Sequence, residues 1–437
     1  MGRRRWVRRG VYGLVLLTLA VVAVFFNHSP GPAAARAFHT ASGRVVMGYA
    51  TDGTLEQPTQ HDLAQIGQLL QTRANAVLDG DHAAFMGVVA TGRPSFTREQ
   101  EVVWQNTRRL RLAALSYAYD DVLHPDTPPL ETPTFLARVT TTYEIAGYDA
   151  SPVQVDAGFS FVKQGGEWKL ASVTDAEDQL DTKALPAPWE GEAIDTYQDG
   201  HYLAVVDHGY RPLARRLVAL CHTGRNAVRR LLDVTPTGPT VILATTQVTG
   251  FDTFSGLDAL AVTYPLAGPD GVTPGWRVMV NPDRVDGVVA SPVVLPHELT
   301  HLESQRYLAY LPKWLAEGAA EYVGWHSAGG LRAAARVRGY RSGSSLQQSL
   351  PSSATFYRQD IDVHYLEGMA LVTWIEAHWG RDAVLSLMRA YAKAGSWDLS
   401  YDPDHATPAI LRAVLGTDPE TLARSAYHQL DVTVRSS

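Results

Sequence analysis

The chain has 437 residues, of which 45% are hydrophobic and 19% are charged, and its formal net charge is -7 at pH 7. This length allows two or three domains with their own cores, and the composition is typical of globular proteins rather than disordered ones. The acidic balance argues against nucleic acid as a partner, because the chain lacks a general basic field. Cys221 is the single cysteine, so a metal site would have to use His, Asp and Glu side chains.

The N-terminal residues differ from the rest of the chain. Residues 1–10 contain five arginines, and residues 11–26 form an uncharged apolar run. Positive charge ahead of an apolar run holds the N-terminus in the cytoplasm and directs the following chain across the membrane. The run is shorter than the roughly 20 residues of a comfortable span. Two alternatives stay open, a retained single-pass anchor, which we favour, and a removed signal peptide of a secreted protein. Both place the C-terminal domains outside the cytoplasm.

Residues 27–58 are rich in Gly, Pro, Ala and Thr and predict a linker, and residues 59–182 predict an α+β domain. Apolar side chains at helical spacing begin at His61, and Gly80 ends that helix. Later segments alternate with period two, as half-buried strands do, and predict an antiparallel sheet. These strands are residues 134–145, 153–164 and 167–175.

The order of elements in residues 59–182 resembles the cone fold of nuclear-transport-factor-like (SnoaL-like) proteins. The resemblance rests on the opening helices joined through L-D-G-D and on the closing strand G-E-W-K-L-A-S-V. It implies a cone-like domain of helices and a curved antiparallel sheet. Because such cones carry enzymes and inert modules alike, the fold indicates no function.

Residues 183–199, with two prolines and several acidic residues, predict a second linker, and residues 200–437 a further domain. Its first part alternates strands with one helix, and its last part is helical, so we expect a small sheet followed by a helical half. The expected strands are residues 201–207, 240–246 and 275–283, the expected helix is 210–233, and helices continue beyond Asp362.

Residues 297–301 read H-E-L-T-H. Side chains four residues apart lie on one face of a helix, so the rings of His297 and His301 can reach one ion at the distance that tetrahedral zinc requires. Glu298 is about 100° further around the helix, where it can reach a water without being a ligand. Two helix starts are possible, with Ser291 as the cap or with Pro296 as the first residue.

A catalytic zinc has three protein ligands and one open position. The segment 312–324, P-K-W-L-A-E-G-A-A-E-Y-V-G, predicts a second helix with Pro312 in its first turn. Small residues at positions 318–320 would let this helix approach the first one closely. Glu317 is then a candidate for the third ligand.

H-E-L-T-H followed by W-L-A-E-G-A-A-E-Y resembles the gluzincin metallopeptidases, in particular their peptidase-MA-like branch related to thermolysin. The resemblance covers about residues 200–395, and its specific part is residues 297–322. It implies a thermolysin-like zincin domain with one Zn²⁺, Glu317 as the third metal ligand, and Glu321 as the carboxylate that hydrogen-bonds a histidine ligand. It also implies that a Tyr or His of the helical half stabilises the oxyanion. Tyr365 is favoured for this role, and His364 is the alternative.

These residues predict an extracytoplasmic zinc metallopeptidase that hydrolyses peptides or proteins, with Glu298 as the general base. The G-x-M-E-N sequence of the aminopeptidase branch is absent, which favours an endopeptidase. The resemblance also implies that an edge strand ahead of the zinc helix binds the substrate backbone, either residues 261–268 or residues 275–283. The alternative function is a catalytically silent, peptidase-like binding or scaffold protein at the cell surface. The arginine-rich segment 332–343 is interpreted as a solvated helix.

Overall fold

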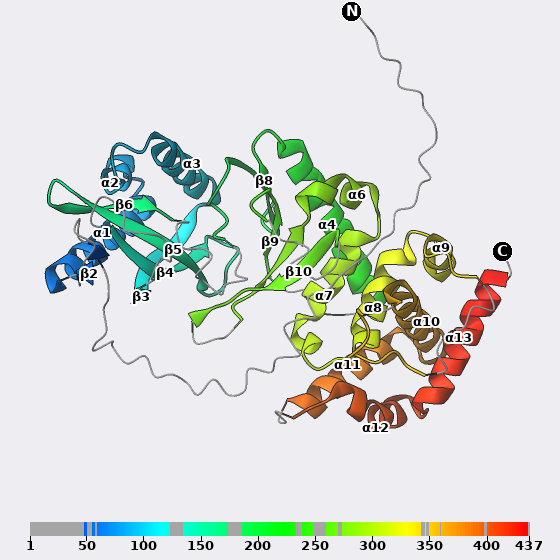
Figure 1. The fold of residues 1–437 in the computed structure, drawn as a ribbon. Coiled ribbons are helices and arrows are strands. Elements are labelled where there is room, and N and C mark those ends of the chain that lie inside the picture. Colours follow the sequence, from blue (N-terminus) through cyan, green and yellow to red (C-terminus); the bar gives the residue numbers. More distant parts are fainter. Residues whose placement is uncertain are drawn as a thin grey trace, which may run out of the picture.

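The computed structural model describes residues 48–49, 55–56, 59–122, 134–173, 186–232, 234, 238–248, 259–269, 273–341, 346, 349–358, 360–396 and 400–435. The predicted basic flank and apolar run, residues 1–26, lie outside this part of the chain. Within it, no helix combines the length and the apolar character that crossing a membrane requires. The chain is a mixed α+β protein, as the sequence predicts (Figure 1).

The N-terminal unit packs three helices against a curled four-stranded antiparallel sheet (Figure 1). The predicted first helix is confirmed, because Thr59 and Asp62 form a capping box at its start and Gly80, with φ of 77°, ends it. The three predicted strands are confirmed as well. The elements are α1 (Gln60–Asp79), α2 (His82–Gly87), α3 (Pro94–Leu110), β3 (Leu112–Val122), β4 (Thr134–Ile145), β5 (Val153–Gln164) and β6 (Glu167–Ser172), preceded by the short pair β1 (Gly48–Tyr49) and β2 (Leu55–Glu56).

A mixed five-stranded sheet follows, in the order β10-β11-β9-β8-β7. β8 and β11 each pair in parallel with β9, whereas β7 and β10 are antiparallel to their neighbours. Of the two candidate edge strands, the first is therefore the edge and the second lies inside the sheet. The bounds are β7 (Ile194–Gln198), β8 (Tyr202–Asp207), α4 (Arg211–Leu232), β9 (Thr240–Ala244), β10 (Ala261–Pro265) and β11 (Trp276–Val280). β7 falls inside the segment 183–199, so the sheet begins within the predicted linker.

The rest of the chain is helical, as expected, and lies beyond the sheet on the side away from the N-terminal unit (Figure 1). Its elements are η3 (Pro282–Arg284), α6 (Val285–Ala290), α7 (Val294–Leu308), α8 (Lys313–His326), α9 (Gly330–Val337), α10 (Ile361–Trp379), α11 (Arg381–Gly395), α12 (Pro403–Leu415) and α13 (Pro419–Arg435).

Both faces of the five-stranded sheet are buried. Because successive side chains of a strand point to opposite faces, Ala204 and Ile242 belong to the core shared with α4, α7 and α8. Their neighbours Val205 and Leu243 belong instead to a core shared with Trp104 and other side chains of the N-terminal unit. The cone-like unit is therefore a packed layer on the sheet, rather than a module held at a distance by a linker.

Asn106 of α3 connects the N-terminal unit to the chain segment that leads into the five-stranded sheet. Its Nδ2 donates to the main-chain oxygens of Trp189, at 3.0 Å, and Glu192, at 2.9 Å, and its Oδ1 accepts from the Ile194 amide at 3.1 Å. The side chain is fully buried. It thus pairs three main-chain groups of the segment that leads into β7, each of which would be costly to leave unpaired.

We expect Asn106→Ala to lower the free energy of unfolding by about 2–4 kcal/mol, because it leaves three buried main-chain groups without partners. Denaturant unfolding followed by fluorescence measures this loss. Asn75→Ala, on the exposed side of α1, is the matched control and should change stability by less than about 0.5 kcal/mol. Equal effects of the two variants would contradict the role given to Asn106.

Candidate metal centre

Helix α7 begins at Val294, between the two starts that the sequence predicts, so neither predicted start is right. Ser291 lies three residues before the helix, and its Oγ accepts a hydrogen bond from the Val293 amide at 3.2 Å. Pro296 is the third residue of the helix. Amides in the first turn have no intrahelical partner, so a proline there removes no hydrogen bond. The ladder starts immediately afterwards, with the His297 amide donating to the Val293 oxygen at 3.0 Å.

Helix α8 is held by backbone-to-backbone packing at two glycines. A Cβ on Gly318 would lie 2.3 Å from the main-chain oxygen of Gly368 in α10. A Cβ on Gly324 would lie 2.9 Å from the main-chain oxygen of Val293, directly before α7. The expectation that residue 318 faces the histidine helix is therefore wrong, since this glycine admits α10. Glu317, next to it, is placed by that contact.

Gly318→Ala should lower the free energy of unfolding by about 1–3 kcal/mol or more, because the added methyl group collides with main-chain atoms that have no rotamer to change. Gly67→Ala, at a position in α1 where a Cβ meets nothing within 4 Å, should instead raise stability by about 0.5–1 kcal/mol. Thermal unfolding of both variants tests whether their effects on the free energy of unfolding have opposite signs. A stabilising Gly318→Ala would contradict the close approach of α8 and α10.

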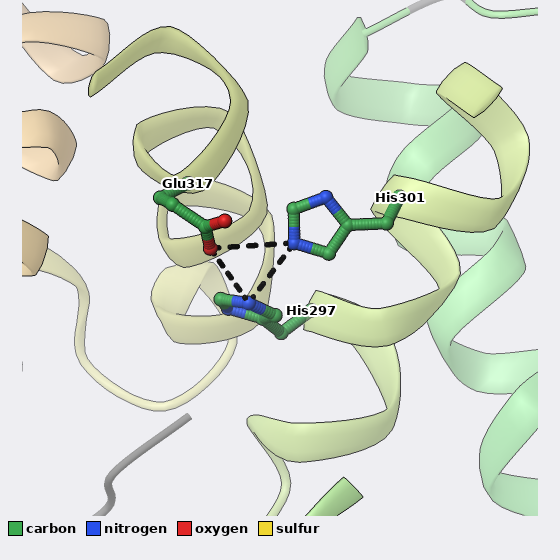
Figure 2. Close-up of side chains that lie close together, drawn as sticks. All are labelled: His297, His301 and Glu317. Atoms are coloured by element: carbon green, nitrogen blue, oxygen red, sulfur yellow. Dashed lines mark hydrogen bonds and ion pairs between the residues drawn. The ribbon is translucent and has the colours of Figure 1, made fainter. Parts of the chain in front are cut away.

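His297, His301 and Glu317 converge, as Figure 2 shows. The two Nε2 atoms lie 3.2 Å apart, and Glu317 Oε2 lies 3.5 Å from His297 Nε2 and 3.4 Å from His301 Nε2. All three side chains are at most 1% exposed, and Glu317 Oε2 accepts no hydrogen bond from the described residues. The three predicted ligands thus lie together, and this ligand group could hold a metal ion.

A chain of buried charges supports His297. Glu321 Oε1 lies 3.1 Å from His297 Nδ1, and Arg338 Nη2 donates to Glu321 Oε2 at 2.6 Å. Burial alone would raise the pKa of Glu321, but Arg338 and His297 outweigh it and lower that pKa. Arg338 also lies 3.6 Å from Asp362. The interpretation of segment 332–343 as a solvated helix is therefore wrong at Arg338, whose side chain is 3% exposed and contacts Glu321.

Glu317 is oriented by a residue that sequence analysis did not single out. Tyr357, in the segment between α9 and α10, donates to Glu317 Oε1 at 2.5 Å. Burial would raise the pKa of Glu317, but the two neighbouring imidazoles hold it well below its usual range. Burial likewise disfavours the charged ring of His297, yet Glu317 and Glu321 raise its pKa to about 10. Glu317 is therefore a carboxylate, with one oxygen tied to Tyr357 and the other turned to the rings.

Glu298 is fully buried beside the histidines. Thr263 Oγ1, on strand β10, lies 2.9 Å from Glu298 Oε2 and 2.9 Å from its main-chain oxygen. Oε1 has no hydrogen-bond partner among the described residues. Burial raises the pKa of Glu298 to about 8, despite the opposing effects of His297 and Thr263.

Tyr365, the favoured one of the two predicted oxyanion donors, lies beside His297. Its ring centroid is 6.1 Å from that of His297, and its buried hydroxyl has no hydrogen-bond partner among the described residues. Burial raises its pKa well above 10, so the phenol keeps its proton and remains a donor. His364 Nδ1 lies 2.7 Å from the Phe356 oxygen, which commits that nitrogen to the main chain.

The sequence matches no protein-family model, and no curated protein matches it either. Over the residues that the structure describes, His297, His301 and Glu317 are the one group of three whose ligand atoms lie close enough to share an ion. Function has to be inferred from these side chains and their neighbours.

We expect the purified chain to carry one equivalent of a divalent metal after dialysis, and His301→Ala to carry less than about a tenth of an equivalent, because two donors hold such an ion much more weakly than three. Elemental analysis by mass spectrometry measures this. His326→Ala, an exposed histidine at the end of α8, is the control and should retain the metal. If the wild-type chain is refolded with added zinc and still contains no metal after dialysis, the proposed site is contradicted.

Proposed function

We propose that this chain is a zinc-dependent peptidase of the gluzincin type, with a thermolysin-like catalytic unit formed by the five-stranded sheet and the helices after it. The observation that carries the proposal is the spacing of the three donor atoms, 3.2, 3.4 and 3.5 Å. Tetrahedral zinc with bonds of about 2.05 Å separates its ligands by about 3.3 Å. The two imidazoles and the carboxylate therefore suit one zinc ion.

The neighbours of the ligands support catalysis over a structural role. Structural zinc sites have four protein ligands, whereas three ligands leave one position for a water or a substrate. A zinc ion held here would lower the pKa of a water and polarise a peptide carbonyl. Glu298 lies one residue after a ligand, and its Oε1 has no partner among the described residues, so it can take a proton.

Glu298, Tyr365 and strand β10 take the remaining catalytic and binding roles. Glu298 accepts a proton from the attacking water and passes it to the leaving amine. Tyr365, a buried phenol without a described partner, donates to the oxyanion of the tetrahedral intermediate. Strand β10 lies at the sheet edge beside α7, where its main chain can align an extended peptide. With no G-x-M-E-N sequence to hold a free amino terminus, we infer an endopeptidase.

The proposed location follows from residues 1–26. A basic flank ahead of an apolar run directs the catalytic unit out of the cytoplasm. The protein is then a single-pass membrane peptidase, or a secreted one if the segment is removed. Its substrates are extracytoplasmic peptides or proteins.

One observation favours a second candidate, a peptidase-like protein that binds without turnover. His297, Glu298, His301, Glu317 and Tyr365 are all fully buried. A substrate would have to displace covering residues to reach them. A binding or scaffold protein at the cell surface has no such requirement.

Glu298→Gln separates the two candidates. The peptidase should lose at least about 100-fold in kcat/KM, because the amide cannot accept the proton, while it keeps one equivalent of zinc, because Glu298 is not a ligand. Cleavage of a broad peptide library, followed by mass spectrometry, together with metal analysis measures both. Zinc uptake by a wild type that cleaves nothing in the library would favour the binding protein.

A further inference from the structure

We propose that Thr263 is a positioning residue that fixes the carboxylate of Glu298, so that one of its oxygens is tethered and the other is presented to the site. This inference rests on the proposed peptidase function for its catalytic meaning, while the tether itself is a property of the folded chain. No motif points to Thr263, and it lies 34 residues before the histidine pair.

Strand β10 brings Thr263 to Glu298. Thr263 pairs with Val278 of the neighbouring strand β11, and it lies two residues after Ala261, whose side chain belongs to the core shared with α7. Residues two apart on a strand share a face, so the Thr263 side chain also points to α7. It is 1% exposed, so its hydroxyl is shielded from bulk solvent.

The hydroxyl contacts Glu298 twice. Thr263 Oγ1 is 2.9 Å from the Glu298 main-chain oxygen and 2.9 Å from Oε2. A threonine hydroxyl has one hydrogen to donate, and both acceptors belong to the same residue. The contact therefore fixes the carboxylate relative to its own backbone, which restricts the side-chain rotamers of Glu298. Thr263 itself has a stiff χ1 because it is β-branched.

The two oxygens of Glu298 consequently differ. Oε2 is the tethered oxygen, and Oε1 has no partner among the described residues. A general base must reach its proton within hydrogen-bond distance, and small errors in placement cost rate. The edge strand thus has two tasks under this proposal, to offer main-chain groups to a peptide and to aim the base.

Three variants test the tether. Thr263→Val removes the hydroxyl and keeps the shape, Thr263→Ser keeps the hydroxyl, and Thr240→Val is the matched control. Thr240 is also a buried strand threonine, but its hydroxyl donates to the Trp276 main-chain oxygen at 3.1 Å rather than to a carboxylate. Thr240→Val loses one hydroxyl contact to a carbonyl, whereas Thr263→Val loses a contact to a carbonyl and one to a carboxylate, so the Thr263→Val variant should lose at least as much stability.

The first readout is peptide hydrolysis by the zinc-loaded full chain. Thr263→Val should lower kcat by about 10- to 100-fold with KM changed less than about two-fold, because the base is misplaced and the peptide-binding edge is intact. Thr263→Ser should recover most of the rate, and Thr240→Val should keep it. An unchanged kcat in Thr263→Val, or a serine variant as slow as the valine variant, would overturn the proposal.

The second readout needs no activity. In the cobalt-substituted chain, the visible absorption spectrum reports the surroundings of the ion. Thr263→Val and Glu298→Gln should both alter it, and Thr240→Val should leave it unchanged. If wild type cleaves no peptide but these spectra behave as expected, the peptidase proposal fails and the tether stands. A Thr263→Val spectrum identical to wild type overturns the tether, whatever the activity.

Discussion

The structure depends on the burial of several carboxylates around two imidazoles. Glu298, Glu317 and Glu321 are fully buried, and Glu317 and Glu321 both lie against His297. Burying an uncompensated charge is costly. Arg338 compensates Glu321, and His297 lies between the carboxylates of Glu317 and Glu321, which raise its pKa to about 10. Without an ion, a proton on this ring provides the missing positive charge. A divalent cation held by this group would provide the same positive charge, and the ring would then contribute a lone pair instead of carrying a proton.

The fold keeps these groups together by contacts that leave little freedom. α8 cannot move away from its position without losing its glycine contacts on two sides, to α10 at Gly318 and to the start of α7 at Gly324. α7 in turn packs on β10 and β11, whose opposite face is covered by the N-terminal unit. The cone-like layer thus has a structural role whatever else it does, because without it a row of apolar side chains on the sheet would face water.

How much of the fold and of the site could be predicted depends on how far apart in the sequence the contacting residues lie. The histidine pair and Glu298 lie within about one helical turn, so their spacing fixes their relative placement, and Glu317 lies on the next helix along the chain. Thr263, Tyr357 and Arg338 reach the site from distant segments, and no periodicity in the sequence specifies such contacts. One signal was available for the cone-like layer. The strands Y-L-A-V-V-D and T-V-I-L-A contain five and four consecutive apolar residues, as strands buried on both faces do, which points to a cover on each side of the sheet.

The segment before α10 adds a constraint on the proposed function. Tyr357 donates to Glu317, and the Phe356 oxygen contacts His364, so the segment of residues 349–358 contacts the site through these two residues. Asp404, near the start of α12, anchors this segment through the hydroxyl groups of Ser352, at 3.2 Å, and Ser353, at 2.7 Å. Since the site residues have no exposed surface, a peptide can reach Glu298 only if covering residues shift. A shift of this segment would release Glu317 Oε1 from Tyr357, so access to the proposed base and the freedom of a proposed metal ligand would change together.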